Sequence, residues 1–327
     1  MAEIVLTMAM PHSAMLKVPP ESWSKDGDRD RSNIREMWFR KKLYTYPDIL
    51  KLRTPEGFDK LMNVEEFKAR HARCQVALAK VTKAIADAKP DVIVIVGKDQ
   101  NEIFRDLSPT LTIYTGKEIY NGPPQRPEYA SNEWRAYPND QELAMHIFRT
   151  AQGAGFDLTD MTNWLPNHWT GGEKVVPHAF GFIIHNVLND NPPPIVPILI
   201  NTFFPPTQPS MPRAIQFGKT LTEAIQSWDS NKRVAIIASG GLSHFVVDEE
   251  KDLEFLEMFK NFDLKGLAET DDRYYQSGTS EIKLFVSPLV AAQKMGYKMT
   301  LVDYIPCYRT EAGTGEGMGF MYWAPEK

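Results

Sequence analysis

Three histidines stand next to predicted strands or helices, where catalytic or metal-binding side chains commonly occur. His12 follows an apolar run at residues 4–8, and His244 follows a second run at residues 234–238 through the sequence Ser-Gly-Gly-Leu-Ser. His178 precedes a stretch with helical periodicity. Imidazole is a metal ligand and an acid–base group that titrates near neutral pH. The residue types and their spacing therefore predict a functional site that draws on distant parts of the chain.

A polar cluster follows a third apolar run, residues 92–96. Its side chains that could bind a ligand are Lys98, Asp99, Gln100, Asn101 and Glu102. In open α/β sheets, sites form outside the carboxyl ends of the strands. We therefore expect this cluster to lie at the same sheet edge as His12 and His244.

Glu281 is the carboxylate with the most distinctive setting. It follows Ser-Gly-Thr-Ser, a sequence typical of helix starts, and so falls in the first turn of a helix predicted over residues 281–295. An acid at this position commonly interacts with the helix dipole or the capped N-terminus. It can also act as a rigidly held metal ligand, since two histidines and one carboxylate leave open positions on Fe(II). The residues alone leave both interpretations open.

The elements that must position these side chains follow an alternating order. β-branched, nearly continuous apolar runs predict buried strands at residues 4–8, 92–96, 195–200 and 234–238, with a fifth strand expected at 300–305. Helical periodicity covers residues 65–88, 141–151, 212–228, 253–262 and 281–295. Strand–helix alternation predicts an α/β fold in which helices flank a central, mostly parallel or mixed sheet.

Long irregular segments separate some of these elements, at residues 17–60 and 107–140. Such loops often form lids or pocket walls. We predict one catalytic domain over residues 1–327, with an inserted helical or loop region at residues 17–62. Glycines alternate in residues 313–319 without a nucleotide-binding pattern, which favours a turn or a pocket wall.

Composition excludes several classes of function. The chain has 327 residues, 43% of them hydrophobic, and a net charge of -5, which argues against a nucleic-acid partner. No apolar run approaches the roughly 20 residues of a membrane span, and the N-terminus lacks the basic start of a signal peptide. Two cysteines, Cys74 and Cys307, are too few for a disulfide framework. We expect a cytoplasmic enzyme that acts on a small molecule.

Taken in chain order, these motifs resemble the class III extradiol ring-cleavage dioxygenase superfamily, typified by the beta subunit of protocatechuate 4,5-dioxygenase. The similarity spans almost the whole chain, and the Gly-Gly-Leu-Ser-His sequence ending at His244 is its most specific part. The other matching pieces are His12-Ser13, residues 91–104, 177–181, 196–206, 277–282 and 303–306.

The resemblance implies a non-haem Fe(II) site, a catechol-type aromatic substrate and O2. It implies that His12 is the first histidine ligand and Glu281 the carboxylate ligand. It further implies that His244 is the acid–base histidine and that His178 is a second pocket histidine, which orients the substrate. Family members are heteromeric or self-associating, so a homo-oligomer, or a complex with a partner subunit, is expected.

One position departs from the family pattern. Gln100 stands where family members carry the second histidine ligand. An amide oxygen is a poorer donor to Fe(II) than imidazole, so metal binding should be weaker. Three alternatives remain: Gln100 binds the metal through its carbonyl oxygen, Asp99 replaces it, or the site holds no metal.

Four further residues are predicted to contact the substrate, namely Asp99, His168, Tyr308 and Arg309. Tyr308, Arg309 or Lys98 could bind a substrate carboxylate, although an ion pair at the surface is the simpler role for each. Two rival functions stay open. One is a hydrolase or lyase on the same scaffold that uses His244 and His178 for acid–base chemistry, and the other is a non-catalytic partner subunit.

Overall fold

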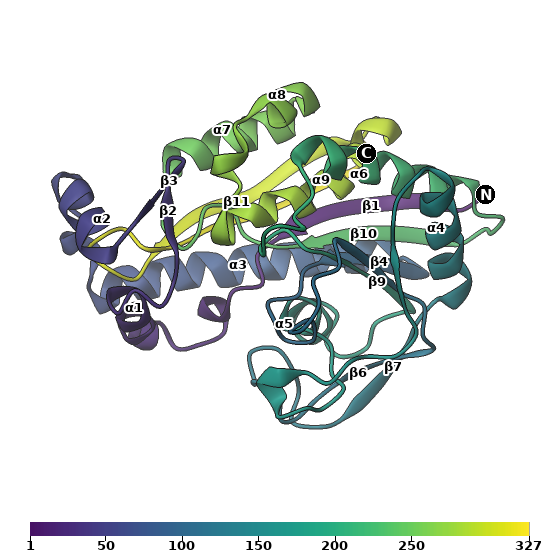
Figure 1. The fold of residues 1–327 in the computed structure, drawn as a ribbon, viewed down its shortest axis with the longest axis horizontal. Helices are drawn as coiled ribbons and strands as arrows, with labels where there is room; N and C mark the ends of the chain where they lie inside the picture. The colour runs from purple at the N-terminus through teal and green to yellow at the C-terminus, as the bar shows by residue number, and fades with distance from the viewer. Residues whose placement is uncertain (327) are drawn as a thin grey trace.

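An eight-stranded sheet forms the centre of the computed structural model, which describes residues 1–326 (Figure 1). Its strand order is β11-β12-β1-β10-β4-β9-β5-β8. The strands are β1 (Glu3–Met10), β4 (Val92–Gly97), β5 (Leu111–Tyr114), β8 (Thr159–Met161), β9 (Ile195–Ile200), β10 (Arg233–Ser239), β11 (Lys298–Tyr308) and β12 (Gly315–Ala324).

The four central strands β1, β10, β4 and β9 are parallel to one another. β5 pairs with β9 and β12 pairs with β1 in antiparallel fashion, so the sheet is mixed. The central strands are apolar at nearly every position because helices cover both faces, as expected for a parallel sheet. This arrangement confirms the predicted α/β fold. It also brings Met10, Gly97 and Ser239, the last residues of β1, β4 and β10, to one edge.

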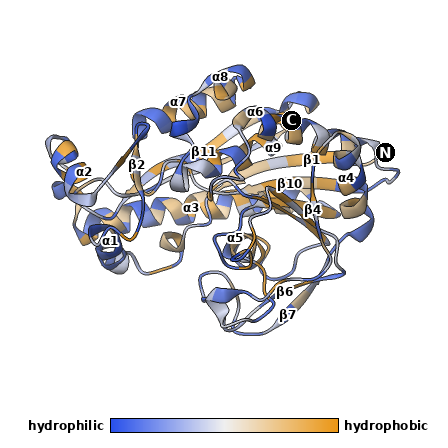
Figure 2. Ribbon diagram, in the orientation of Figure 1, coloured by the Kyte–Doolittle hydropathy of each residue, from blue (hydrophilic) through white to orange (hydrophobic). Residues whose placement is uncertain are grey.

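Helices cover the two faces of the sheet. In Figure 1, α6 (Met211–Ser227), α7 (Glu249–Lys260), α8 (Leu264–Glu269) and α9 (Ile282–Met295) lie above it, and α3 (Val64–Ala88) and α5 (His178–Phe182) lie below. α4 (Gln141–Gly153) packs against α6. Alternate residues of each strand contribute to separate apolar cores, which Figure 2 shows as orange strands and orange inner helix faces.

Residues 17–62 form small elements at the left end of the molecule in Figure 1. They are α1 (Trp23–Arg31), the hairpin of β2 (Met37–Phe39) and β3 (Lys42–Tyr44), and α2 (Tyr46–Arg53). A second hairpin, β6 (Glu118–Asn121) and β7 (Arg135–Pro138), lies within the other long segment. The remaining elements are 3₁₀ turns at Ala14–Leu16, Pro20–Ser22, Thr54–Glu56, Phe58–Leu61, His168–Thr170, Asp272–Tyr274 and Ser277–Glu281, and a π turn at Ile183–Val187.

The glycine-rich segment near the C-terminus lies mostly in β12 and pairs with β11, so it is not a turn; its Glu316 lines a cavity, in keeping with the pocket-wall alternative. A Cβ atom on Gly315 would lie 1.9 Å from the Cys307 carbonyl oxygen, and one on Gly317 would lie 2.2 Å from the Asp252 carboxylate. These glycines therefore permit close packing within a strand. Over residues 1–326, no helix is both long enough and apolar enough to cross a lipid bilayer.

Candidate functional site

A cavity of about 680 Å³ opens at the edge where β1, β4 and β10 end. We call it the main cavity. Five of the residues predicted to act in metal binding or catalysis line it: His12, Gln100, His178, His244 and Glu281. They come from segments far apart in the sequence because parallel strands deliver their carboxyl ends to one edge of the sheet.

Two glycines allow the backbone to approach the site closely. A Cβ atom on Gly278 would lie 2.0 Å from Cδ2 of His244, and one on Gly240 would lie 2.9 Å from Cβ of Glu281. Both distances are below 3.0 Å, the limit under which Cβ contacts essentially do not occur, and the one at Gly278 is far below it. The Gly-Gly-Leu-Ser-His and Ser-Gly-Thr-Ser-Glu sequences thus place His244 and Glu281 against backbone that carries no side chain.

His12 presents an unprotonated nitrogen to the cavity. The Ser239 hydroxyl donates to the Ala179 carbonyl oxygen at 2.7 Å, so it accepts a hydrogen bond from Nδ1–H of His12 at 3.1 Å. This fixes the tautomer and leaves the lone pair on Nε2, which lies 3.8 Å from Oε1 of Glu281. Burial lowers the pKa of His12 to about 3, which keeps the ring neutral.

Glu281 is the electrostatic centre of the site. It ends a 3₁₀ turn directly before α9, and its Oε2 accepts the Gly241 N–H at 2.6 Å. Its Oε1 lies 2.8 Å from Nζ of Lys98, a lysine that is only 1% exposed. Burial alone raises the pKa of Glu281, but the nearby Lys98, His244 and His12 outweigh burial and hold it well below its usual range.

His244 is held so that its Nε2 faces the carboxylate of Glu281. Its Nδ1–H donates to the Leu242 carbonyl oxygen at 2.8 Å, and its Nε2 lies 3.5 Å from Oε1 of Glu281. Burial lowers the pKa of His244, but Glu281 and Glu316 outweigh this effect, and the net shift is upward. A histidine that both carries and releases a proton suits acid–base work.

His178 is the first residue of α5 and is fixed by Glu102, which is fully buried. Oε1 of Glu102 lies 2.6 Å from Nδ1 of His178, and Oε2 accepts the backbone N–H of His178 at 2.8 Å. Trp169 stacks on the imidazole with ring centroids 5.1 Å apart. Sequence reasoning placed Glu102 in a polar cluster but assigned it no role. Nothing in the sequence around Glu102 indicates that it pairs with His178, because the two residues meet only in the tertiary fold.

Asp99 does not line the main cavity. Its carboxylate accepts the backbone N–H groups of Glu102, Ile103 and Phe104, and so shapes the loop that follows β4. Burial and the neighbouring Glu102 raise its pKa to about 6. The carboxylate is committed to the backbone, so the geometry supports neither the predicted substrate contact nor the alternative of Asp99 as a metal ligand.

The other predicted substrate contacts also have different partners. His168 is exposed, and neither it nor Tyr308 lines the main cavity. Tyr308 is buried, and its hydroxyl donates to Glu249. Arg309 does line the cavity, but its guanidinium forms two hydrogen bonds with Asp30, at 2.6 and 3.1 Å. The sequence could not reveal these partners because both acids lie far away along the chain.

The residues that could hold a metal are fewer than the two histidines and one carboxylate of the family pattern. Among residues 1–326, no three His, Cys, Asp or Glu side chains come together as a metal site. His12 and Glu281 provide one imidazole and one carboxylate, and Gln100 lines the same cavity. Two acceptors that face each other, Nε2 of His12 and Oε1 of Glu281, fit a cation between them. Lys98 already supplies one positive charge to that carboxylate.

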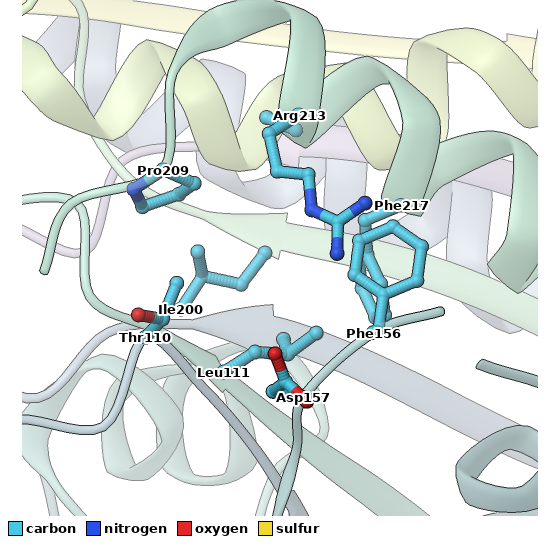
Figure 3. Close-up of a pocket in the computed structure, with 9 residues that line it drawn as sticks. Thr110, Leu111, Phe156, Asp157, Ile200, Pro209, Arg213 and Phe217 are labelled. Carbon is cyan, nitrogen blue, oxygen red and sulfur yellow. The ribbon is translucent and has the colours of Figure 1, made fainter. Parts of the chain in front are cut away.

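A second pocket lies between α6 and the β5–β9 end of the sheet (Figure 3). Its volume is about 200 Å³, and the Arg213 guanidinium lies 3.7 Å from the centre of the Phe156 ring. Within the part of the chain that the structure describes, no histidine or cysteine lines this pocket. The residues that the sequence predicted for metal binding and catalysis line the main cavity instead.

Comparison with known families gives one result. A family model described as the catalytic LigB subunit of aromatic ring-opening dioxygenase matches residues 62–312. No curated protein matches the chain. The matched region is well over half of the chain and contains Gln100, His178, His244 and Glu281, while His12 precedes it. The chain therefore belongs to the LigB family of aromatic ring-opening dioxygenases.

Proposed function

We propose that this protein is an Fe(II)-dependent extradiol dioxygenase, which opens a catechol-type ring beside its two adjacent hydroxyls. The observation that carries the proposal is the pair formed by Nε2 of His12 and Oε1 of Glu281. Both atoms are electron-pair donors, and they face each other at 3.8 Å in a buried site. A divalent cation between them turns an unfavourable contact into two favourable ones. Membership of the LigB family supports the same chemistry.

His12, Gln100 and Glu281 would hold the metal. Bound Fe(II) would supply a centre at which the two substrate oxygens and O2 meet. Ser239 keeps Nδ1 of His12 protonated and so keeps Nε2 free for the metal. The neutral amide of Gln100 would replace a neutral imidazole, so the charge of the site would not change.

His244 acts as the general base toward a substrate hydroxyl. Its Nδ1 is committed to the Leu242 carbonyl oxygen, so proton transfer takes place at Nε2. His178 orients the substrate through its own Nε2, because Nδ1 is engaged by Glu102. Trp169 covers one face of that imidazole and keeps the ring in a single orientation. Positioned proton transfer of this kind typically contributes 10²–10⁴-fold to the rate.

Metal analysis and oxygen uptake test the proposal. The purified protein, reconstituted with Fe(II) under anaerobic conditions, should bind about one metal ion and consume O2 with catechols. His244→Ala should keep the metal but lose about 10²–10⁴-fold in turnover. His12→Ala should lose the metal itself. Full activity of His244→Ala would refute the assignment of the base, and a protein that binds no Fe(II) would refute the proposal.

A second candidate function has one observation in its favour. The Lys98 ammonium already neutralises Glu281, so the buried carboxylate needs no metal to be stable. His244 and the His178–Glu102 pair could then perform acid–base chemistry, as in a hydrolase or lyase. Turnover by chelator-treated protein without O2 consumption would favour this function over the dioxygenase.

A further inference from the structure

We infer that Glu316 selects the substrate of the main cavity: a polyhydroxylated ring whose extra substituent is a hydrogen-bond donor, rather than a catechol that carries a carboxylate. The inference rests on the proposed function, which it deepens by naming the substrate class. Glu316 is the second residue of β12 and lies in the glycine-rich segment, to which sequence reasoning assigned no chemistry. It lines the main cavity together with His244 and Glu281.

Glu316 lies beside the acid–base histidine. A Cβ atom on Gly241 would lie 2.5 Å from Oε1 of Glu316 and 3.1 Å from Cε1 of His244. Both side chains therefore pack over the same bare stretch of backbone. Glu316 is only 7% exposed; burial raises the pKa of its carboxyl group, and the nearby Ser13 hydroxyl opposes that shift. One hydroxyl leaves most of the acceptor capacity of a carboxyl group unused.

The three groups that the sequence suggested for binding a substrate carboxylate are committed elsewhere. Lys98 pairs with Glu281, and Tyr308 donates to Glu249. The remaining group, the Arg309 guanidinium, is bonded to Asp30, which is fully buried.

Three other arginines line the cavity. Arg29 and Arg126 are exposed to solvent, and the half-buried Arg35 is paired with Asp26 and Asp30. The buried part of the cavity beside His244 thus offers an acceptor carboxyl without a free buried cation among the described residues that line it.

The chemistry of the ring substituent follows from this charge arrangement. A hydroxyl or amino group that reaches Glu316 donates a hydrogen bond to a charged acceptor, which is among the stronger kinds of hydrogen bond. A carboxylate at the same place meets a second carboxylate in a poorly solvated site, where like charges repel strongly. The cavity should therefore bind 1,2,3-trihydroxybenzene more tightly than catechol, and catechol more tightly than 2,3-dihydroxybenzoate, whose carboxylate occupies the same ring position as the third hydroxyl.

Anaerobic binding titrations on the Fe(II)-loaded protein test this order without requiring turnover. Wild type should bind the trihydroxy ring at least about tenfold more tightly than catechol, the gain expected from one good hydrogen bond. Glu316→Ala should remove that gain and leave the affinity for catechol within about twofold. Glu316→Gln should keep part of the gain through its amide oxygen and should tighten binding of 2,3-dihydroxybenzoate by about tenfold or more.

Glu36→Gln is the matched control, because Glu36 is an acid that lines the same cavity from an exposed position. It should leave the binding order unchanged. If wild type and both Glu316 variants show the same ratios of affinity for the three rings, the inference is overturned and the proposed function stays intact. The same holds if Glu36→Gln changes these ratios as the Glu316 variants do. A wild-type protein that binds none of the three rings would overturn both. The near-isosteric glutamine variant keeps the test valid if the alanine variant fails to fold.

Discussion

At the scale of single residues, the site is organised by one carboxylate oxygen that several basic groups share. Oε1 of Glu281 has Nζ of Lys98 at 2.8 Å and an imidazole nitrogen of His244 at 3.5 Å. A buried ammonium and a metal ion would both stabilise the same negative charge, so they compete for it. The lysine therefore affects both the stability of the metal-free protein and its affinity for metal.

Replacing Lys98 by methionine tests this competition. Removing one partner of a buried ion pair leaves an uncompensated charge, so metal-free Lys98→Met should lose about 3–5 kcal/mol of unfolding free energy. Fe(II) or Mn(II) should restore much of the loss and should bind at least about tenfold more tightly than to wild type. Urea denaturation with and without metal, together with metal titration, measures both quantities.

The matched control is Lys83→Met, which breaks an exposed Lys83–Asp87 pair on α3 and should change stability by less than about 0.5 kcal/mol. Weaker metal binding by Lys98→Met than by wild type would show that the lysine assists the metal instead of competing with it.

The hydroxyl of Ser239 controls which nitrogen of His12 is free. In Ser239→Ala the Nδ1–H group loses its acceptor, so the tautomer that presents the Nε2 lone pair is no longer favoured. Loss of such a supporting hydrogen bond typically costs 10–100-fold in metal affinity. Metal titration should show a decrease of that size. Ser227→Ala removes the hydroxyl 3.1 Å from His146 at the surface and should leave metal affinity unchanged. Equal effects of the two variants would argue against the tautomer mechanism.

At the scale of elements, the approach of the 3₁₀ turn Ser277–Glu281 to the loop after β10 determines the position of His244. A methyl group on Gly278 would overlap the imidazole, with only 2.0 Å between its Cβ and Cδ2 of His244. We expect Gly278→Ala to displace the ring and to reduce kcat by about 10²-fold or more, the contribution typical of a positioned base.

Steady-state kinetics and metal analysis check this prediction, because the variant should still bind metal. Gly153→Ala is the control, since a Cβ atom there has no neighbour within 4 Å. Normal kcat in Gly278→Ala would mean that the turn can shift without displacing the His244 imidazole from its catalytic position.

The sequence predicts those elements whose patterns are unambiguous. Continuous β-branched runs located β4, β9 and β10 to within one residue at either end, because strands buried on both faces are apolar throughout. β5 and β8 were missed because four and three residues are too short for a pattern. β12 was missed because glycine normally signals a turn, whereas Gly317 here makes room for Asp252.

The site was predictable to the extent that strand ends determine it. His12 and His244 follow parallel neighbouring strands, so their meeting follows from the fold. Glu102 and Glu316 could not be assigned roles from the sequence, and Lys98 was considered only for a substrate carboxylate, because a charged residue is typically exposed unless a partner is known. Each is buried by a partner or a close neighbour that lies far away in the chain.

At the scale of the whole molecule, buried acids join segments that the sheet alone does not connect. Asp30 of the N-terminal segment bonds Arg309, which directly follows β11, and thereby fixes residues 17–62 against the main cavity. Asp252 of α7 joins the loop after β10 to β11 in the same way. It accepts the backbone N–H and the hydroxyl of Ser243, and also the hydroxyl of Tyr304 on β11.

Asp252 should make the stability of the molecule depend on pH. Burial raises the pKa of Asp252 to about 7, whereas an unfolded aspartate has a pKa near 3.8. Between those values the folded state holds a proton that the unfolded state has released, so the unfolding free energy falls as pH rises through this window. Each unit of difference between the folded and unfolded pKa values corresponds to about 1.4 kcal/mol. The loss of unfolding free energy attributable to Asp252 therefore approaches about 4 kcal/mol above pH 7.

Asp252→Asn keeps a hydrogen-bonding side chain but removes this titration. Urea denaturation of wild type and variant from pH 4 to pH 8 should show the stability of wild type, relative to the variant, falling by about 3–4 kcal/mol up to pH 7 and then levelling off. Asp91→Asn, an exposed acid in the turn before β4, is the control and should show no comparable trend. If the unfolding free energy of wild type relative to Asp252→Asn stays constant over this range or rises with pH, Asp252 is charged in the folded protein. Its hydrogen-bond donors would then lower its pKa by more than burial raises it.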